Sequence, residues 1–289
     1  MQRRVIVTAD DFGLSIPVNE AVERAHRDGV LAGASLMVAE PAAADAVARS
    51  NALPQLRVGL HVVVVVGRPL LPPEAIPDLV DRDGMLDTRL VRAGVRYFFR
   101  RRVRAQLERE IRAQFAAFAA TGLPFDHVNA QCHLHLHPTV LGIVLRAARE
   151  YGNPPVRFPY EPFGASWRAG RDRPALRFAN GVLLAPWLTL LKRRLRAAGI
   201  AHNDRVLGLG DTGRMTPQRT LALLRELQPG VTELFFHPAT RRWPELPPEA
   251  ADYRLEDELA ALLDPAVARA LSAPGIERIA FGDLRAVRA

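Results

Sequence analysis

Hydrophobic residues in this chain occur in short runs that alternate with longer amphipathic stretches. The short runs are rich in β-branched residues and bounded by turn-forming residues, as strands are, whereas the stretches between them space apolar residues three or four positions apart, as helices do. The pattern predicts helices near 17–28, 41–51, 104–120, 138–151, 216–227 and 256–271. It predicts strands at Val5–Thr8, Ala34–Val38, Arg57–Val63, His127–His133, Val156–Phe158, Arg205–Leu207, Val231–Phe236 and Arg278–Ala280.

Strand–helix alternation of this kind is typical of an α/β fold with a parallel sheet. Seven or eight repeats favour closure, and a closed (β/α) barrel of about 250 residues with insertions suits a chain of 289 residues. We therefore expect a distorted (β/α) TIM-like barrel of seven or eight parallel strands, in one domain over residues 1–289. An open doubly wound sheet is the alternative. Residues 67–103 and 160–203 interrupt the alternation and are expected to form two helical or loop insertions.

The stretch FDHVNAQCHLHLHP, residues 125–138, holds four of the eight histidines. Polar and apolar residues alternate strictly along it, which predicts a strand with one face on the core and the other on a polar cavity. A strand rises about 3.3 Å per residue, so at most two neighbours on the polar face could share a metal ion. That face would carry His127, Asn129, Gln131, His133, His135 and His137.

Charge and cysteine content narrow the classes of partner. The formal net charge of +8 suggests nucleic acid, but the basic residues are almost all arginine, Lys192 is the only lysine, and no nucleic-acid-binding motif is present. Nucleic acid is therefore not expected as a partner. Cys132, the only cysteine, is expected to pack on the apolar face of its strand. The absence of disulfides and of a signal-peptide pattern favours a cytoplasmic location.

The two insertions share an unusual composition. Each joins a bulky apolar segment to a basic cluster, in VRYFFRRRVR (95–104) and NGVLLAPWLTLLKRRLRAAG (180–199). This composition is typical of a helix that lies on a membrane surface, which would place the protein on the inner face of the membrane as a peripheral protein. An amphipathic helix that packs on the barrel and solvates its arginines explains the same composition. Both interpretations remain open at this point.

Chemistry-bearing residues collect at the carboxyl ends of the expected strands, where α/β barrels place their sites. They are Asp10 and Asp11 after the first strand, His61, Arg157, His237 and the histidine face. An oxygen and two neutral nitrogens can hold a divalent ion with a position open for water. A free carboxylate can then take the proton of that water, and a separate imidazole can protonate a leaving group. Each residue alone has a structural explanation, such as helix capping by an aspartate, but together they favour metal-assisted hydrolysis.

Several motifs resemble those of a known family in order and spacing over most of the chain. TADDFG (8–13), GLH (59–61), HVNAQCHLH (127–135) and HPA (237–239) resemble the YdjC-type carbohydrate deacetylases. Within that family, residues 67–84, RFPYEP (157–162) and GDTGRM (210–215) resemble the hopanoid-biosynthesis branch, HpnK. The resemblance implies a distorted barrel and metal-dependent removal of an acetyl group from an N-acetylglucosaminyl group. In the hopanoid branch that sugar would be carried by a hopanoid glycolipid, and the products would be acetate and the amino sugar.

The resemblance also implies roles for individual residues. Asp10 would be the general base and Arg157 would orient it, Asp11 and His61 would be ligands of the metal, and His237 would be the general acid. The expected cofactor is one divalent ion, zinc or magnesium.

The third metal ligand is where this chain departs from the family, because the usual histidine is replaced by Gln131. A carboxamide oxygen suits magnesium better than zinc. The alternative is that His133, next on the same face, completes the site, and we favour it because an imidazole normally outcompetes an amide for a transition metal. His135, His127 and Tyr160 are expected to contact the substrate.

Two rival functions remain open. One is a metal-dependent phosphoesterase, which the arginines would suit. The other is a degenerate member of the family that binds glycolipid without turnover, since a metal ligand is replaced. The expected partner is in every case a small molecule, most specifically a glycolipid or amino-sugar substrate.

Overall fold

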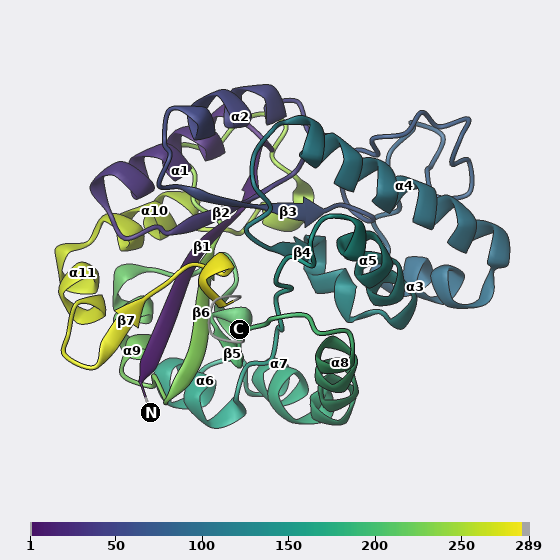
Figure 1. Ribbon diagram of the computed structural model, residues 1–289. Coiled ribbons are helices and arrows are strands. Elements are labelled where there is room, and N and C mark those ends of the chain that lie inside the picture. Colours follow the sequence, from purple (N-terminus) through teal and green to yellow (C-terminus); the bar gives the residue numbers. More distant parts are fainter. Residues whose placement is uncertain (1, 285–289) are drawn as a thin grey trace.

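The computed structural model describes residues 2–284 and shows one parallel sheet flanked by helices (Figure 1). The sheet has the order β4-β3-β2-β1-β6-β5, and β7 pairs with the first residues of β1. β1 is the longest strand and lies at the centre, where it pairs with three other strands. The strands are β1 (Arg3–Phe12), β2 (Gly33–Leu36), β3 (Arg57–Val62), β4 (Val128–Ala130), β5 (Arg205–Leu207), β6 (Gly230–Phe236) and β7 (Ile276–Arg278).

The sheet curls into a half-barrel and does not close into a full (β/α) barrel (Figure 1). The edge strands β4 and β5 are linked only through extended residues 155–160, in which the Arg157 N–H donates to the Val128 carbonyl and the Tyr160 carbonyl accepts from Val206. Pro155 and Pro159 have no N–H group to donate, and the segment contributes an isolated parallel bridge between Val156 and Val128 in place of a strand. The α/β class and the parallel strands are confirmed, whereas the expected closed barrel and the strand at 156–158 are wrong.

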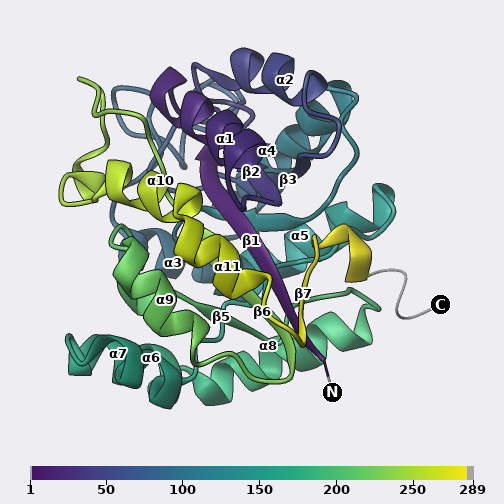
Figure 2. The ribbon, with the colours of Figure 1, turned by 90° about the vertical axis from the view of Figure 1, so that its left-hand side faces the viewer.

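Helices pack along the apolar face of the curled sheet. Figure 2 shows α1, α10 and α11 crossing in front of β1, and Figure 1 shows α4 and α5 beside β3 and β4. The expected helix at 256–271 is two helices, because Pro265 starts a new helix that Asp264 caps with its side chain. The helices are α1 (Ile16–Asp28), α2 (Ala43–Asn51), α3 (Leu90–Phe99), α4 (Arg101–Ala120), α5 (Pro138–Glu150), α6 (Phe163–Gly170), α7 (Pro174–Phe178), α8 (Ala185–Ala197), α9 (Pro217–Leu224), α10 (Leu255–Leu263) and α11 (Pro265–Leu271).

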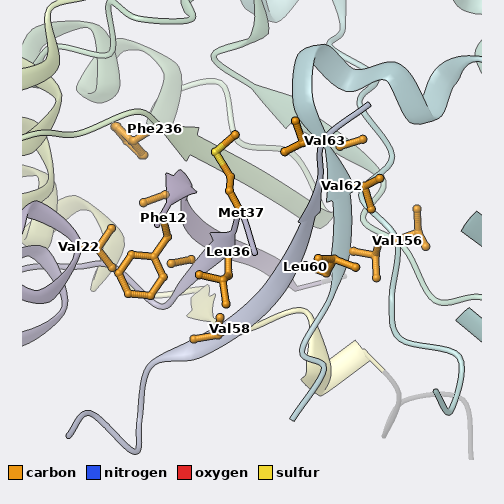
Figure 3. Packing of buried hydrophobic residues seen from close by; sticks show 14 of the residues in the cluster. Phe12, Val22, Leu36, Met37, Val58, Leu60, Val62, Val63, Val156 and Phe236 are labelled. Atoms are coloured by element: carbon orange, nitrogen blue, oxygen red, sulfur yellow. The ribbon is translucent and has the colours of Figure 1, made fainter. Parts of the chain in front are cut away.

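The apolar core packs between the sheet and these helices (Figure 3). Phe12, Leu36, Leu60 and Val62 come from three neighbouring strands and are fully buried. Burial of one such side chain stabilises the fold by roughly 1.5–3 kcal/mol. The opposite face of the sheet carries buried polar residues from β1, β2, β3, β4 and β6 and from the residue just before β4, namely Thr8, Asp10, Ser35, His61, His127, Asn129 and Glu233. The apolar layer therefore supports a polar interior on the curled side.

The first insertion is a long loop over residues 67–89 followed by α3 and the start of α4, and the second is mainly helical. The basic segment 95–104 is not one helix, because extended Arg100 separates α3 from α4. The second insertion contains α6, α7, a π-helical turn (Ala179–Leu183) and α8. Within residues 2–284 no single helix is long and apolar enough to cross a membrane; the bent pair Pro174–Leu183 and Ala185–Ala197, at 44°, meets that length and composition only when taken together.

The histidine-rich stretch is not the long strand that its alternation predicts. β4 ends at Ala130, and residues Gln131–Leu136 form a 3-10 helix that is kinked at Cys132 and His133, with φ angles of 51° and 52°. A left-handed turn of this kind is uncommon for residues other than glycine. It places three consecutive side chains, Gln131, Cys132 and His133, along one cavity. The expected packing of Cys132 is therefore wrong, since its side chain is exposed.

Candidate active site

A cavity of about 1060 Å³ lies at the carboxyl ends of β1, β3, β4 and β6. Strand ends converge there because neighbouring parallel strands all point the same way. Arg157, His127, His135 and Tyr160 are outside its lining. The structure brings together, along the wall of this cavity, Asp10, Asp11, His61, Gln131, His133 and His237.

Both aspartates face the cavity because β1 is irregular at its end. In a regular strand, successive side chains point to opposite faces. The pairing of β1 with β2 shifts between Ala9 and Phe12, and Asp11 adopts a left-handed φ of 64°. Gly13 follows at φ 95°, with the Met37 carbonyl only 3.0 Å from where a Cβ would stand. This backbone turn delivers two carboxylates from adjacent positions to one site.

Arg157 holds the Asp10 carboxylate from below the cavity. Its Nη1 and Nη2 donate to the two Asp10 oxygens at 2.5 and 2.9 Å, and its Nε and Nη2 donate to Glu233. All three side chains are almost completely buried. Burial alone would raise the pKa of Asp10, but the Arg157 guanidinium holds it well below its usual range. Asp10 is therefore an ionised carboxylate at neutral pH.

A second chain of hydrogen bonds reaches Asp10 within the polar interior of the sheet. Ser35 Oγ donates to Asp10 Oδ1 at 2.9 Å and lies 2.9 Å from His127 Nε2, while His127 Nδ1 lies 2.9 Å from Asp126 Oδ2. Gly59 permits this arrangement, because a Cβ there would stand 2.5 Å from His127 Nδ1. The His127 ring is fully buried and stacks on Phe281. His127 is thus separated from the cavity and linked to the Asp10 carboxylate through Ser35, and this position does not support the expected contact with substrate.

His61, Asp11 and Gln131 form a cluster whose donor atoms suit a divalent ion. The Asn129 carboxamide donates through Nδ2 to Asp10 and Ser35, so its Oδ1 accepts a hydrogen bond from the His61 Nδ1–H group at 2.7 Å. His61 Nε2 then presents a lone pair, 2.8 Å from Gln131 Oε1 and 3.6 Å from Asp11 Oδ1. Asp11 Oδ1 is buried and has no hydrogen-bond partner.

Electron-pair donors this close repel each other unless a cation or a proton lies between them. One imidazole nitrogen and two oxygens, one of them anionic, are ligands that divalent ions accept. The residues present therefore fit a bound metal, although no group of three His, Cys, Asp or Glu side chains in the described part of the chain is arranged around one. The reason is that the third donor is a carboxamide.

His133 lines the same cavity but does not join this cluster. Its ring packs edge-on against Phe235, with centroids 5.2 Å apart, and its Nδ1 has no hydrogen-bond partner. Burial, together with the positive charge of Arg157, lowers the pKa of His133 well below its usual value, so the ring is neutral. Of the two candidates for the third ligand, the geometry supports Gln131.

His237 stands at the end of β6 and lines the cavity near Glu258. Its backbone N–H donates to Glu258 Oε2, and its Nδ1 lies 4.0 Å from the same oxygen. Glu258 is fully buried, and burial raises its pKa. The His237 ring also packs on Tyr253, with centroids 5.3 Å apart. A buried carboxyl group beside the imidazole is suited to orient it and to stabilise its protonated form.

Three further side chains were candidates for the site. His135 Nε2 contacts the Arg157 carbonyl at 3.0 Å, and burial lowers the pKa of His135 to about 3. It supports the backbone of Arg157 and lies outside the cavity lining, as does Tyr160. Cys132 faces the cavity, but the enclosing walls raise the pKa of its thiol to about 12, which makes it a poor nucleophile.

Sequence reasoning missed three residues that the structure ties to this site: Ser35, Glu233 and Glu258. Two of them had a signal. Glu258 falls on the apolar face of its helix, between Leu255 and Leu262, and Glu233 interrupts the apolar run of β6. An acid at an expected core position must be paired or hydrogen-bonded, which marks it as part of a polar network. Ser35 carries no comparable signal.

The fold and this cavity define a class of α/β protein with a polar site at the carboxyl ends of a curled parallel sheet. The chain belongs to the YdjC-like protein family, whose model matches residues 4–273. It is 30% identical over 283 residues to the carbohydrate deacetylase of Geobacillus stearothermophilus, which covers 97% of this chain and 98% of that protein. It is 40% identical over 157 residues to the carbohydrate deacetylase of Brevibacillus brevis, an alignment that spans 54% of this chain and 60% of that protein.

A solved structure shows the same fold. The crystal structure of a protein from Enterococcus faecalis V583, provisionally described as a cellobiose-phosphate cleavage protein, matches with a TM-score of 0.74 at 22% identity. The match covers 98% of this chain and 99% of that one. At this level of identity the likeness concerns the fold.

Proposed function

We propose that this chain is a metal-dependent carbohydrate N-deacetylase, a hydrolase that cleaves the amide bond of an acetylated amino sugar. The family and the relatives named carbohydrate deacetylase support this enzyme class. The observation that carries the proposal is that two neighbouring carboxylates in one cavity have different partners. Arg157 keeps Asp10 ionised, while the neighbouring Asp11 has a free buried oxygen directed toward His61 and Gln131.

The residues of the chain divide the chemistry between them. A divalent ion held by Asp11, His61 and Gln131 would supply Lewis-acid polarisation of the acetyl carbonyl. Asp10 takes the proton of the attacking water, and Arg157 keeps its carboxylate oriented. His237 gives a proton to the departing amine. One water and one amide are thereby converted into acetate and a free amino sugar.

The substrate we propose is an N-acetylglucosaminyl group on a hopanoid glycolipid, with the protein in peripheral contact with the membrane. Residues 67–84, 157–162 and 210–215 support it through their resemblance to the HpnK branch. The cavity supports an amphipathic substrate, since its wall adds a large apolar area to the polar site, from residues that include Ile16, Met85, Trp243, Leu246 and Tyr253. A lipid-linked sugar should then react faster than a soluble chito-oligosaccharide, and equal rates on both would contradict this substrate.

One alternative has a specific observation in its favour. Gln131 replaces a family ligand, so a degenerate member that binds glycolipid without turnover would have this cavity too. The metal content of the purified protein separates the two, because a non-catalytic member would not retain an ion. For a phosphoesterase, Arg157 offers no support, because it is occupied by Asp10 and Glu233, and Arg68 is the arginine in the cavity lining that a phosphate could reach.

The experiment that tests the proposed function is acetate release by Asp10→Asn. We expect the variant to bind metal as the wild type does and to lose deacetylation, because it has no base. The matched control is Glu245→Gln, which neutralises an exposed carboxylate on the wall of the same cavity. Phosphate release from phosphorylated sugars is measured alongside. Near-normal acetate release by Asp10→Asn, or phosphate release by the wild type, would contradict the proposal.

A further inference from the structure

A second concave feature lies outside the active-site cavity. It is a groove of about 400 Å³ between α4, α5 and α8, and three arginines, Arg104, Arg146 and Arg194, line it. Arg146 is paired with Glu108, with Nη2 and Oε2 3.0 Å apart. Arg104 and Arg194 are exposed and make no side-chain hydrogen bond or ion pair with residues 2–284. The groove therefore has a net charge of +2, from Arg104 and Arg194, which residues 2–284 do not neutralise.

One flank of this arginine groove is an apolar face on α3. Val91, Val95, Phe98 and Phe99 recur at helical spacing, so they form one stripe along the helix. Their exposed fractions are 83%, 53%, 49% and 72%. A surface helix normally turns its apolar stripe toward the core, whereas α3 leaves this stripe in solvent.

The other flank comes from the second insertion. The segment from α7 to α8 exposes Phe178, Leu183 and Leu190 at 46%, 65% and 41%. Exposed basic side chains follow directly, because Arg193 and Arg196 belong to the same helix as Leu190. An apolar stretch bordered by cations is thus present on both sides of the groove.

Residues 136 and 137 join the two flanks and the groove into one surface. The Trp187 indole of α8 donates to the Leu136 carbonyl at 2.8 Å, and the His137 ring lies 6.2 Å from the ring of Phe98 on α3. His137 immediately precedes Pro138, which starts α5 and lines the groove. Figure 1 shows α3, α4, α5 and α8 together on one side of the molecule, away from α1, α10 and α11.

We propose that this surface docks on a bilayer that contains anionic phospholipids, with a headgroup phosphate in the arginine groove. Guanidinium groups bind phosphate strongly, and apolar side chains next to them can enter the boundary between headgroups and acyl chains. A second copy of the chain does not fit this surface, because two such copies would bring like-charged grooves together. Docking needs no catalysis. Delivery of a lipid-linked sugar from the bilayer to the cavity would rest additionally on the proposed function.

The test is sedimentation of the full chain with vesicles. One set contains equal parts of phosphatidylglycerol and phosphatidylcholine, and the other contains phosphatidylcholine alone. We expect binding to the anionic vesicles that weakens with salt. Each basic residue at an anionic surface contributes about 1 kcal/mol, or about fivefold in the partition constant, so Arg104→Gln with Arg194→Gln should lower it about 25-fold. Val91→Ser with Phe99→Ser, at the two most exposed positions of the stripe, should also lower it.

The matched control removes the same charge elsewhere. Arg24→Gln with Arg269→Gln changes two exposed arginines of α1 and α11, on the other side of the molecule, and should leave binding unchanged apart from a small long-range effect. Acetate release from a soluble substrate should be unaffected in every variant, which separates failed docking from a wrong enzyme class. The proposal would be overturned if the groove variant and the control variant lost vesicle binding equally. It would also be overturned if the wild type did not bind the anionic vesicles. A dimer that Val91→Ser with Phe99→Ser dissociates would assign the surface to self-association instead.

Discussion

Replacement of Arg157 by methionine tests the electrostatics of the site most directly. The guanidinium is fully buried and is hydrogen-bonded to the carboxylates of Asp10 and Glu233, which are buried as well. Arg157→Met has similar bulk but leaves two buried negative charges without a counter-ion. Removal of one partner from a buried ion pair typically costs about 3–5 kcal/mol. Adding Glu233→Gln should restore part of this loss, because only one uncompensated charge then remains.

The expected loss can be converted into a melting temperature. Unfolding entropy near the midpoint is about 2.1 cal/mol/K per residue, or about 0.6 kcal/mol/K for 289 residues. A loss of 3–5 kcal/mol therefore lowers Tm by about 5–8 °C. Arg177→Met is the matched control, since Arg177 is an equally buried arginine that pairs with Asp211 and Asp172 outside the cavity. It should lower Tm by less, because Asp172 is 40% exposed and Arg219 remains 3.3 Å from a carboxylate oxygen of both Asp172 and Asp211.

The two variants should differ in their dependence on pH. The folded-state pKa of Asp10 lies below its unfolded value, so this group stabilises the fold above about pH 4 and loses that contribution as pH falls through the folded pKa. Without Arg157, burial should raise the pKa of Asp10, so that folded Arg157→Met takes up a proton as pH falls from 7 toward 4. The stability difference from wild type should shrink over that range, and the acid limb of kcat should move to higher pH. Unfolding in urea between about pH 4 and 8 measures the stability difference, and profiles of kcat over the same range measure the position of the acid limb. A constant stability difference with an unmoved acid limb would refute the assigned role of Arg157.

The remaining predictions concern the residues around Asp10 and the metal ligands. Gln131→His should tighten zinc binding about tenfold or more, measured by competition with a chelator, because an imidazole replaces an amide oxygen. His133→Ala should leave the zinc affinity unchanged, and loss of zinc in that variant would make His133 the ligand. Ser35→Ala should lower kcat about tenfold with little change in KM, since Asp10 loses one of its donors, and Ser35→Thr should restore it; no rescue by threonine would mean that the hydroxyl only fills space. Glu258→Gln should shift the basic limb of kcat to lower pH, because the His237 imidazolium loses a nearby carboxyl group; an unchanged limb would show that Glu258 does not act on His237.

The local sequence determined most of the strands and helices and the strand ends that carry polar side chains of the cavity, but not the elements at 131–136 and 156–158. The three residues Arg205–Leu207 form the expected strand, and the helix from Pro138 ends within one residue of its predicted end. Period-two and period-3.6 patterns report such elements, because each records which face of a segment is buried. Convergence of Asp10, His61 and His237 was equally foreseeable, since the carboxyl ends of parallel strands meet at one edge of the sheet.

Only the tertiary structure decided how those residues are arranged. The place of Gln131 beside His61, and of His133 apart from it, depends on the left-handed turn at Cys132 and His133, which the alternating pattern conceals. The half-barrel stays open where residues 155–160 form an isolated bridge to β4 in place of a full strand. The partners of Arg157 come from β1 and β6, positions 147 and 76 residues away along the chain. Hydrophobic periodicity describes one segment at a time. Backbone turns of this kind and buried charge pairs depend on contacts between distant segments, which exist only once the sheet has formed.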